Sequence, residues 1–150
     1  MILYVDLDDT ICNYTKRFNE VKDDCVYVEY PQSSANFYDF MEPVDGAIET
    51  IYDLSYLFDL YILTAPSPYN PLTYSGKAKW VGKHLGLEIL KKLIICPNKG
   101  LLKGDVLIDD HIEGCGQENF EGKLIKFTNW YLTIKELKDY RINQFKTGDW

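Results

Sequence analysis

The sequence predicts one α/β domain, built as a Rossmann-like three-layer α/β/α sandwich with a parallel sheet at its centre. Short apolar runs without polar interruption recur along the 150 residues, and such runs are typical of strands buried on both faces of a parallel sheet. Segments with apolar residues at helical spacing lie between most of these runs, as expected for a parallel α/β sheet. The length suits a single unit, so we expect residues 1–150 to form one domain.

Apolar runs predict the strands, and periodic segments predict the helices. The runs lie at residues 2–5, 60–63, 93–95, 106–108 and 124–127. Helical spacing first appears over residues 13–24. A second helix is expected to open at Glu42-Pro43, because proline suits a first helical turn. A third covers residues 77–85 and is closed by Gly86, and the last begins near Thr133, an N-cap candidate.

Charge and hydropathy exclude several classes of protein. The net charge of −7 argues against binding duplex nucleic acid through the overall field. No stretch approaches the ~20 apolar residues of a membrane helix, and polar residues interrupt the start of the chain before a signal peptide could form. The four cysteines are widely spaced, which favours buried, reduced thiols over a metal cluster or a redox motif. We therefore expect a cytoplasmic protein with no nucleic-acid or membrane partner.

Reactive side chains follow four of the five predicted strands. In chain order they are Asp6 and Asp8, Thr64, Lys99, and Asp109 with Asp110. Because the carboxyl ends of parallel strands meet at one edge of the sheet, we expect these groups to lie together. Clustered carboxylates without histidine or cysteine are hard oxygen ligands, and they suit Mg²⁺.

This set of residues predicts phosphoryl transfer. A cation would let Asp6 stay ionised beside its neighbours and attack phosphorus, which gives an aspartyl-phosphate. Lys99 and Thr64 would bind the phosphoryl oxygens. Asp8 is close enough to give a proton to the leaving alcohol and later to take one from water. Lys77, near a helix start, is a further candidate phosphate ligand.

The order of these pieces resembles the four motifs of the haloacid dehalogenase-like phosphatases. The matching pieces are DLDDT at 6–10, LT at 63–64, the lysine at 99 and IDD at 108–110. The resemblance implies that Asp6 is the nucleophile and Asp8 the acid/base. It implies that Thr64 binds phosphate and that Lys99 balances charge. The implied Mg²⁺ ligands are Asp6, the Asp8 carbonyl and Asp110, with Asp109 in support.

Further stretches resemble the 5′(3′)-deoxyribonucleotidase branch, which implies hydrolysis of nucleoside monophosphates with deoxyribonucleotides preferred. They are residues 42–47, 64–68, 77–81 and 99–110. The chain departs from the branch at Asp9, where the first motif usually has glycine, and at Pro97, where the branch has an arginine. The segment before Glu42 is also shorter, so the branch's nucleobase pocket cannot be carried over.

The segment after the first strand, residues 13–42, is predicted to be a small cap insertion. Its aromatic-rich part, residues 25–41, is either a lid that sets specificity or a packing patch. A small cap leaves a cleft open, which a partner subunit of a homo-oligomer could complete. Two alternatives remain for the function. One is a phosphatase for another small phosphorylated metabolite, and the other is a phosphoacceptor or nucleotide-binding domain without turnover.

Overall fold

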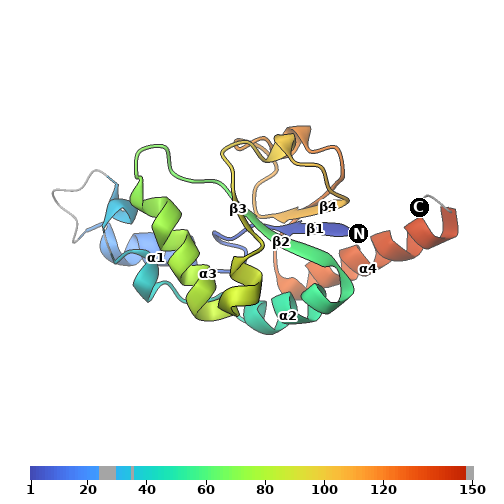
Figure 1. The fold of residues 1–150 in the computed structure, drawn as a ribbon, viewed down its shortest axis with the longest axis horizontal. Coiled ribbons are helices and arrows are strands. Elements are labelled where there is room, and N and C mark those ends of the chain that lie inside the picture. Colours follow the sequence, from blue (N-terminus) through green and yellow to red (C-terminus); the bar gives the residue numbers. More distant parts are fainter. Residues whose placement is uncertain (24–29, 35, 148–150) are drawn as a thin grey trace.

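The computed structural model describes residues 1–23, 30–34 and 36–147, and within them the chain alternates between strands and helices (Figure 1). The strands are β1 (Ile2–Val5), β2 (Asp59–Thr64), β3 (Leu93–Ile95), β4 (Val106–Asp109) and β5 (Lys123–Lys126). The helices are α1 (Tyr14–Val21), α2 (Ala47–Leu57), α3 (Leu72–Leu90) and α4 (Trp130–Thr147). Short 3₁₀ turns lie at η1 (Pro31–Ser33), η2 (Tyr38–Phe40), η3 (Lys99–Leu101) and η4 (Gln117–Asn119).

All pairings between the described strands are parallel, in the order β3-β2-β1-β4-β5, which confirms the predicted α/β fold with a parallel sheet. The strand β1 lies at the centre, and Val5 is in register with Ile62 on one side and Ile108 on the other. These three side chains are fully buried. The carboxyl end of β1 therefore lies between the carboxyl ends of β2 and β4. These two strands end at Thr64 and Asp109.

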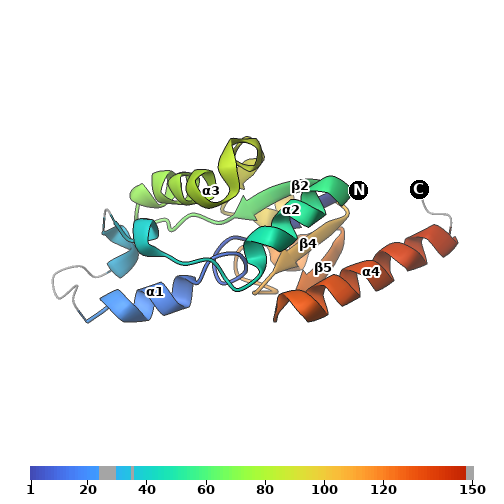
Figure 2. The ribbon, with the colours of Figure 1, turned by 90° about the horizontal axis from the view of Figure 1, so that it is seen from below.

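The two faces of the sheet are covered differently. Figures 1 and 2 show α2, α3 and α4 on one face, and their apolar side chains form the main core with the alternate residues of β1, β2 and β4. The loops that carry η3 and η4 cover the other face over a smaller cluster centred on Tyr4, Leu63, Leu107 and Phe120. None of the helices in the described part of the chain has both the length and the apolar character needed to cross a membrane.

The start of α2 corrects one prediction. The helix begins at Ala47, after Gly46 in a left-handed conformation with φ of 72°, and not at Pro43. Pro43 instead forms an antiparallel bridge with Cys12, and the N–H of Val44 donates to the carbonyl of Ile11 at 2.8 Å. Residues 42–44 are thus held in extended form by the segment that follows β1, because the two segments form backbone hydrogen bonds with each other.

The boundaries of α3 and α4 also differ from those predicted. The helix α3 begins at Leu72, and Gly86 interrupts it with φ of 77°, as predicted for its closure, although one further turn follows. Thr133 is not the N-cap of α4, because it lies buried inside the helix. The cap is Asn129, whose side-chain oxygen accepts a hydrogen bond from the N–H of Leu132 at 2.9 Å.

The segment predicted as a cap contains α1, η1 and η2, which lie together beside α3 at one end of the molecule (Figures 1 and 2). Part of the predicted lid, residues 25–29 and 35, lies outside the described residues, as does Cys25. Among the described cysteines, Cys12, Cys96 and Cys115 are free thiols. Cys12 is buried, as expected, whereas Cys96 and Cys115 are partly exposed.

Candidate active site

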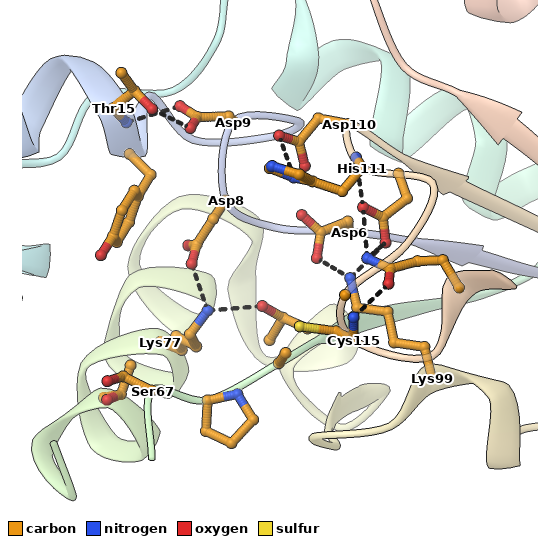
Figure 3. A pocket seen from close by; sticks show the side chains of 18 of the residues that line it. Asp6, Asp8, Asp9, Thr15, Ser67, Lys77, Lys99, Asp110, His111 and Cys115 are labelled. Carbon is orange, nitrogen blue, oxygen red and sulfur yellow. Dashed lines mark hydrogen bonds and ion pairs between the residues drawn. The ribbon is translucent and has the colours of Figure 1, made fainter. Parts of the chain in front are cut away.

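The residues predicted for the site line one cavity of about 460 Å³ at the carboxyl edge of the sheet. The set comprises Asp6, Asp8, Thr64, Lys77, Lys99, Asp109 and Asp110. Figure 3 labels five of them, namely Asp6, Asp8, Lys77, Lys99 and Asp110. They come from the ends of β1, β2 and β4, from η3 and from the first half of α3. The convergence of parallel strand ends therefore places these groups together, as the sequence predicts.

One part of the cavity, which we call the floor, is a buried network of Asp6, Lys99, Asp109 and Gln117. The ammonium of Lys99 donates to Asp6 Oδ1 at 2.5 Å and to Asp109 Oδ2 at 2.5 Å. The side-chain amide of Gln117 donates to both oxygens of Asp109 at 3.2 and 3.3 Å. All four side chains are at least 94% buried, so the network is shielded from water.

The floor holds one cation for two carboxylates, and this imbalance governs its electrostatics. Burial raises the pKa of Asp6 to about 7, since Lys99, which opposes this shift, is shared with Asp109. Burial alone would lower the pKa of Lys99, but Asp6 and Asp109 together raise it above its ordinary value. The lysine therefore remains charged, and the floor favours a further positive charge near Asp6.

The opposite part of the cavity, which we call the wall, consists of Asp8, Thr64, Lys77 and Tyr38. Lys77 is buried on α3, and its ammonium donates to Asp8 Oδ2 at 2.7 Å and to Thr64 Oγ1 at 2.7 Å (Figure 3). The side chain of Asp8 is 27% exposed, in contrast to the carboxylates of the floor. Lys77 therefore joins the end of β2 to the loop after β1, at the place expected for a phosphate ligand.

Asp109, Asp110 and His111 form a group that could hold a metal ion. One ligand atom from each lies within 4.8 Å of the others, and the imidazole Nδ1 of His111 is 2.8 Å from Asp110 Oδ2. Asp6 and Asp8, which the resemblance also implied as ligands, lie outside this group. In the described arrangement their carboxylates bind Lys99 and Lys77 respectively.

Asp9, which stands where the first motif of the branch usually has glycine, has a structural role that the sequence did not reveal. It adopts the left-handed conformation with φ of 55°, which glycine favours and which aspartate tolerates better than most residues. Its carboxylate accepts from the N–H of Thr15 at 2.8 Å and from the Thr15 hydroxyl at 2.5 Å, in the first turn of α1. Asp9 thus caps α1, whereas the buried hydroxyl of the neighbouring Thr10 has no hydrogen-bond partner among the described residues.

Tyr38 and Gln117 line the cavity as well, although no motif points to them. The ring of Tyr38 packs on Gly76, where an added Cβ would come within 2.4 Å of Tyr38 Cδ2. Burial, and then the charge of Asp8, raises the pKa of the Tyr38 phenol, so this hydroxyl stays protonated. Gln117 could be recognised only from its contact with Asp109, because it lies eight positions further along the chain, after a loop.

The fold and these motifs define a member of the haloacid dehalogenase-like phosphatases, and a family model narrows the class. The model described as 5′ nucleotidase, deoxy (Pyrimidine), cytosolic type C protein matches residues 22–146. The chain therefore belongs to this 5′-nucleotidase family of phosphoric monoester hydrolases, as predicted. The first motif, which contains Asp6, lies before the matched segment.

Named relatives agree with this family. A Vibrio phage KVP40 protein named "Putative 5′(3′)-deoxyribonucleotidase" is 28% identical over 143 residues, which cover 91% of this chain and 84% of the phage protein. The cytosolic type of 5′(3′)-deoxyribonucleotidase from Homo sapiens is 31% identical over 80 residues, 52% of this chain. That match covers 40% of the human protein.

Proposed function

We propose that this chain is a Mg²⁺-dependent 5′(3′)-deoxyribonucleotidase, which hydrolyses nucleoside monophosphates through an aspartyl-phosphate on Asp6. The observation that carries the proposal is the buried pairing of Asp6 with Lys99 beside Asp109, at the carboxyl edge of the sheet. The names of the phage and human relatives support the substrate class, and the cytosolic type of the human relative supports a cytoplasmic location.

The donor set at this edge fits a hard divalent cation. Asp110 and Asp109 offer carboxylate oxygens close to one another, and the excess negative charge of the floor favours a cation beside them. Asp6 and the Asp8 carbonyl would complete the set of ligands, as the family resemblance implies. When bound, Mg²⁺ would neutralise the negative charge that develops on the phosphoryl oxygens.

In the first step we assign nucleophilic attack to Asp6. A carboxylate oxygen of Asp6 forms a bond to phosphorus, and the bond between phosphorus and the ester oxygen breaks. Lys99 keeps Asp6 oriented, while Thr64 and Lys77 bind phosphoryl oxygens. These oxygens would draw Lys77 from its contact with Asp8. The freed Asp8, which carries the proton that it took from water in the second step of the preceding cycle, would give that proton to the leaving oxygen.

In the second step water releases the phosphate. The Asp8 carboxylate takes a proton from a water molecule, whose oxygen attacks the phosphorus of the aspartyl-phosphate. The bond between phosphorus and Asp6 breaks, and the Asp6 carboxylate is restored. Residues 13–42, which we propose act as the cap, would cover the organic part of the substrate during both steps.

Phosphate release from a panel of substrates tests the proposal. We expect turnover of deoxynucleoside monophosphates with Mg²⁺, loss of turnover in chelator, and slower turnover of sugar phosphates. Asp6→Asn should lower kcat by at least about 10³-fold, because the amide is a poor nucleophile. Equal rates on nucleotides and sugar phosphates would favour a phosphatase of other small metabolites. A stable phospho-aspartate without turnover would favour a phosphoacceptor domain.

A further inference from the structure

The hydroxyl of Tyr38 is a buried polar group without a hydrogen bond among the described residues. Tyr38 lies on η2, only 4% of its surface is exposed, and it lines the cavity that holds Asp8 and Lys77. A buried hydroxyl without a partner destabilises the fold by about 1–3 kcal/mol, whereas phenylalanine would fill the same space without this cost. The hydroxyl therefore has no stabilising role in the described contacts.

The ring that carries this hydroxyl is held firmly in place. One side packs on Gly76 of α3, where no side chain larger than glycine fits. Phe37 meets the ring edge to face at a centroid distance of 5.3 Å, and the ammonium of Lys77 lies 5.9 Å from its centroid. A ring fixed between η2 and α3 presents its hydroxyl in one position, as a group that recognises a ligand must.

The surroundings of the hydroxyl indicate which part of a substrate it would meet. After burial, Asp8 contributes most to the raised pKa of the Tyr38 phenol, and Tyr14 follows. Thr64 and Lys77 offer donors to the phosphoryl group at the strand ends, so the organic part of the ester must project towards Asp8 and the segment that carries Tyr38. The phenol is a neutral donor, and it suits an uncharged oxygen there better than a phosphoryl oxygen.

We propose that Tyr38 is a specificity-determining residue whose hydroxyl donates a hydrogen bond to an oxygen of the substrate's sugar. The inference rests on the proposed function, because it takes the substrate to be a phosphate ester of a sugar. It extends that function by assigning a polar contact to η2, a segment in which the sequence shows only an aromatic cluster. The contact would distinguish sugar esters from simple alkyl or aryl esters.

Tyr38→Phe, assayed on two classes of ester, tests this contact. With a deoxynucleoside 5′-monophosphate, kcat/KM should fall about three- to tenfold, the effect of one neutral hydrogen bond. With p-nitrophenyl phosphate, which has no sugar, it should change less than twofold. The variant should unfold at the same temperature as the wild type or a higher one, because the substitution removes an unpaired buried hydroxyl. Tyr4→Phe is the matched control, since the Tyr4 hydroxyl donates to the Lys103 carbonyl at 2.8 Å on the other face of the sheet.

Tyr4→Phe should lower the unfolding temperature and leave both activities unchanged. An equal loss on both esters for Tyr38→Phe would place its hydroxyl on the phosphoryl group and overturn the inference. Unchanged activity on both, or a loss of stability, would overturn it too. If the wild type hydrolyses sugar phosphates but no nucleotide, the nucleotidase assignment fails, and the comparison of sugar and aryl esters still decides the role of Tyr38. A wild type that hydrolyses only the aryl ester would refute both proposals.

Discussion

The floor and the wall of the cavity each contain a buried lysine paired with a carboxylate, but the two regions differ in how completely their polar groups are paired and buried. In the floor, Lys99 is fully engaged by two buried carboxylates, and Gln117 fixes one of them further. In the wall, Lys77 divides its ammonium between one carboxylate and one hydroxyl, and Asp8 remains partly open to solvent. Tyr38 adds a hydroxyl that has no partner in the described residues.

The contacts of the two regions indicate that the floor is the more rigid of the two and that the wall is more open to a ligand. A buried network such as the floor, whose polar groups are all paired and shielded from water, keeps its geometry. The loss of any one member leaves another buried group without its partner, so such a network does not tolerate substitution. The wall holds Lys77 between Asp8 and Thr64, and under the proposed mechanism these groups exchange partners when a substrate binds. Substitutions should therefore damage stability most in the floor, whereas in the wall they should damage binding and turnover more than stability.

Lys99→Met should have the largest effect on stability. It leaves Asp6 and Asp109 buried, adjacent and without their cation, and breaking a buried ion pair in this way costs about 3–5 kcal/mol. We expect this loss in the free energy of unfolding in urea at neutral pH, together with loss of activity. Lys92→Met is the control, because its pair with Asp59 is exposed and worth about 0–1 kcal/mol. A Lys99→Met variant as stable as the control would show that the floor is not a structural network.

Lys77→Met should destabilise the protein less and impair turnover. Asp8 can turn to water when it loses Lys77, so a cost of about 1–3 kcal/mol is expected, mainly from the buried Thr64 hydroxyl. Loss of one donor to the phosphoryl group should lower kcat/KM about 10²-fold. The matched control is Lys79→Met, two positions along α3 with an exposed side chain, which should leave kcat/KM unchanged. If Lys77→Met destabilises the fold as much as Lys99→Met, the wall is as important for stability as the floor, and the two regions do not differ in this respect.

The members of the two regions were not equally visible in the sequence. Asp6, Thr64 and Asp109 could be placed at one edge because each follows an apolar strand, and parallel strands bring their carboxyl ends together. Lys99 could be included because its loop joins two such strands. The parallel α/β fold was predictable for the same reason, since its strands are short apolar runs separated by helical segments.

Other features depend on contacts that no local pattern records. Gln117 reaches Asp109 through a loop, and Tyr38 reaches the cavity because Gly76 on a distant helix leaves room for its ring. Pro43 has the properties of a helix start, but backbone pairing with the segment after β1 overrides that preference. Asp9 caps α1 from a position six residues before Thr15, too far for the usual capping pattern.

The charge excess of the floor can be tested by its effect on the pH dependence of stability in chelator. The folded protein holds the proton of Asp6 up to about pH 7, whereas the unfolded chain releases it near pH 3.8. Between these values the folded state binds more protons, so the free energy of unfolding contributed by Asp6 falls as pH rises towards 7. Asp6→Asn should remove this fall, so that urea denaturation shows a smaller loss of stability between pH 5 and about pH 8 than in the wild type. Asp59→Asn is the control. Its free energy of unfolding should change with pH as that of the wild type does, because Lys92 lowers the pKa of Asp59 and this carboxyl therefore titrates below pH 5. If Asp6→Asn instead steepens the decline, Lys99 neutralises Asp6 fully, and the floor has no need of a second cation.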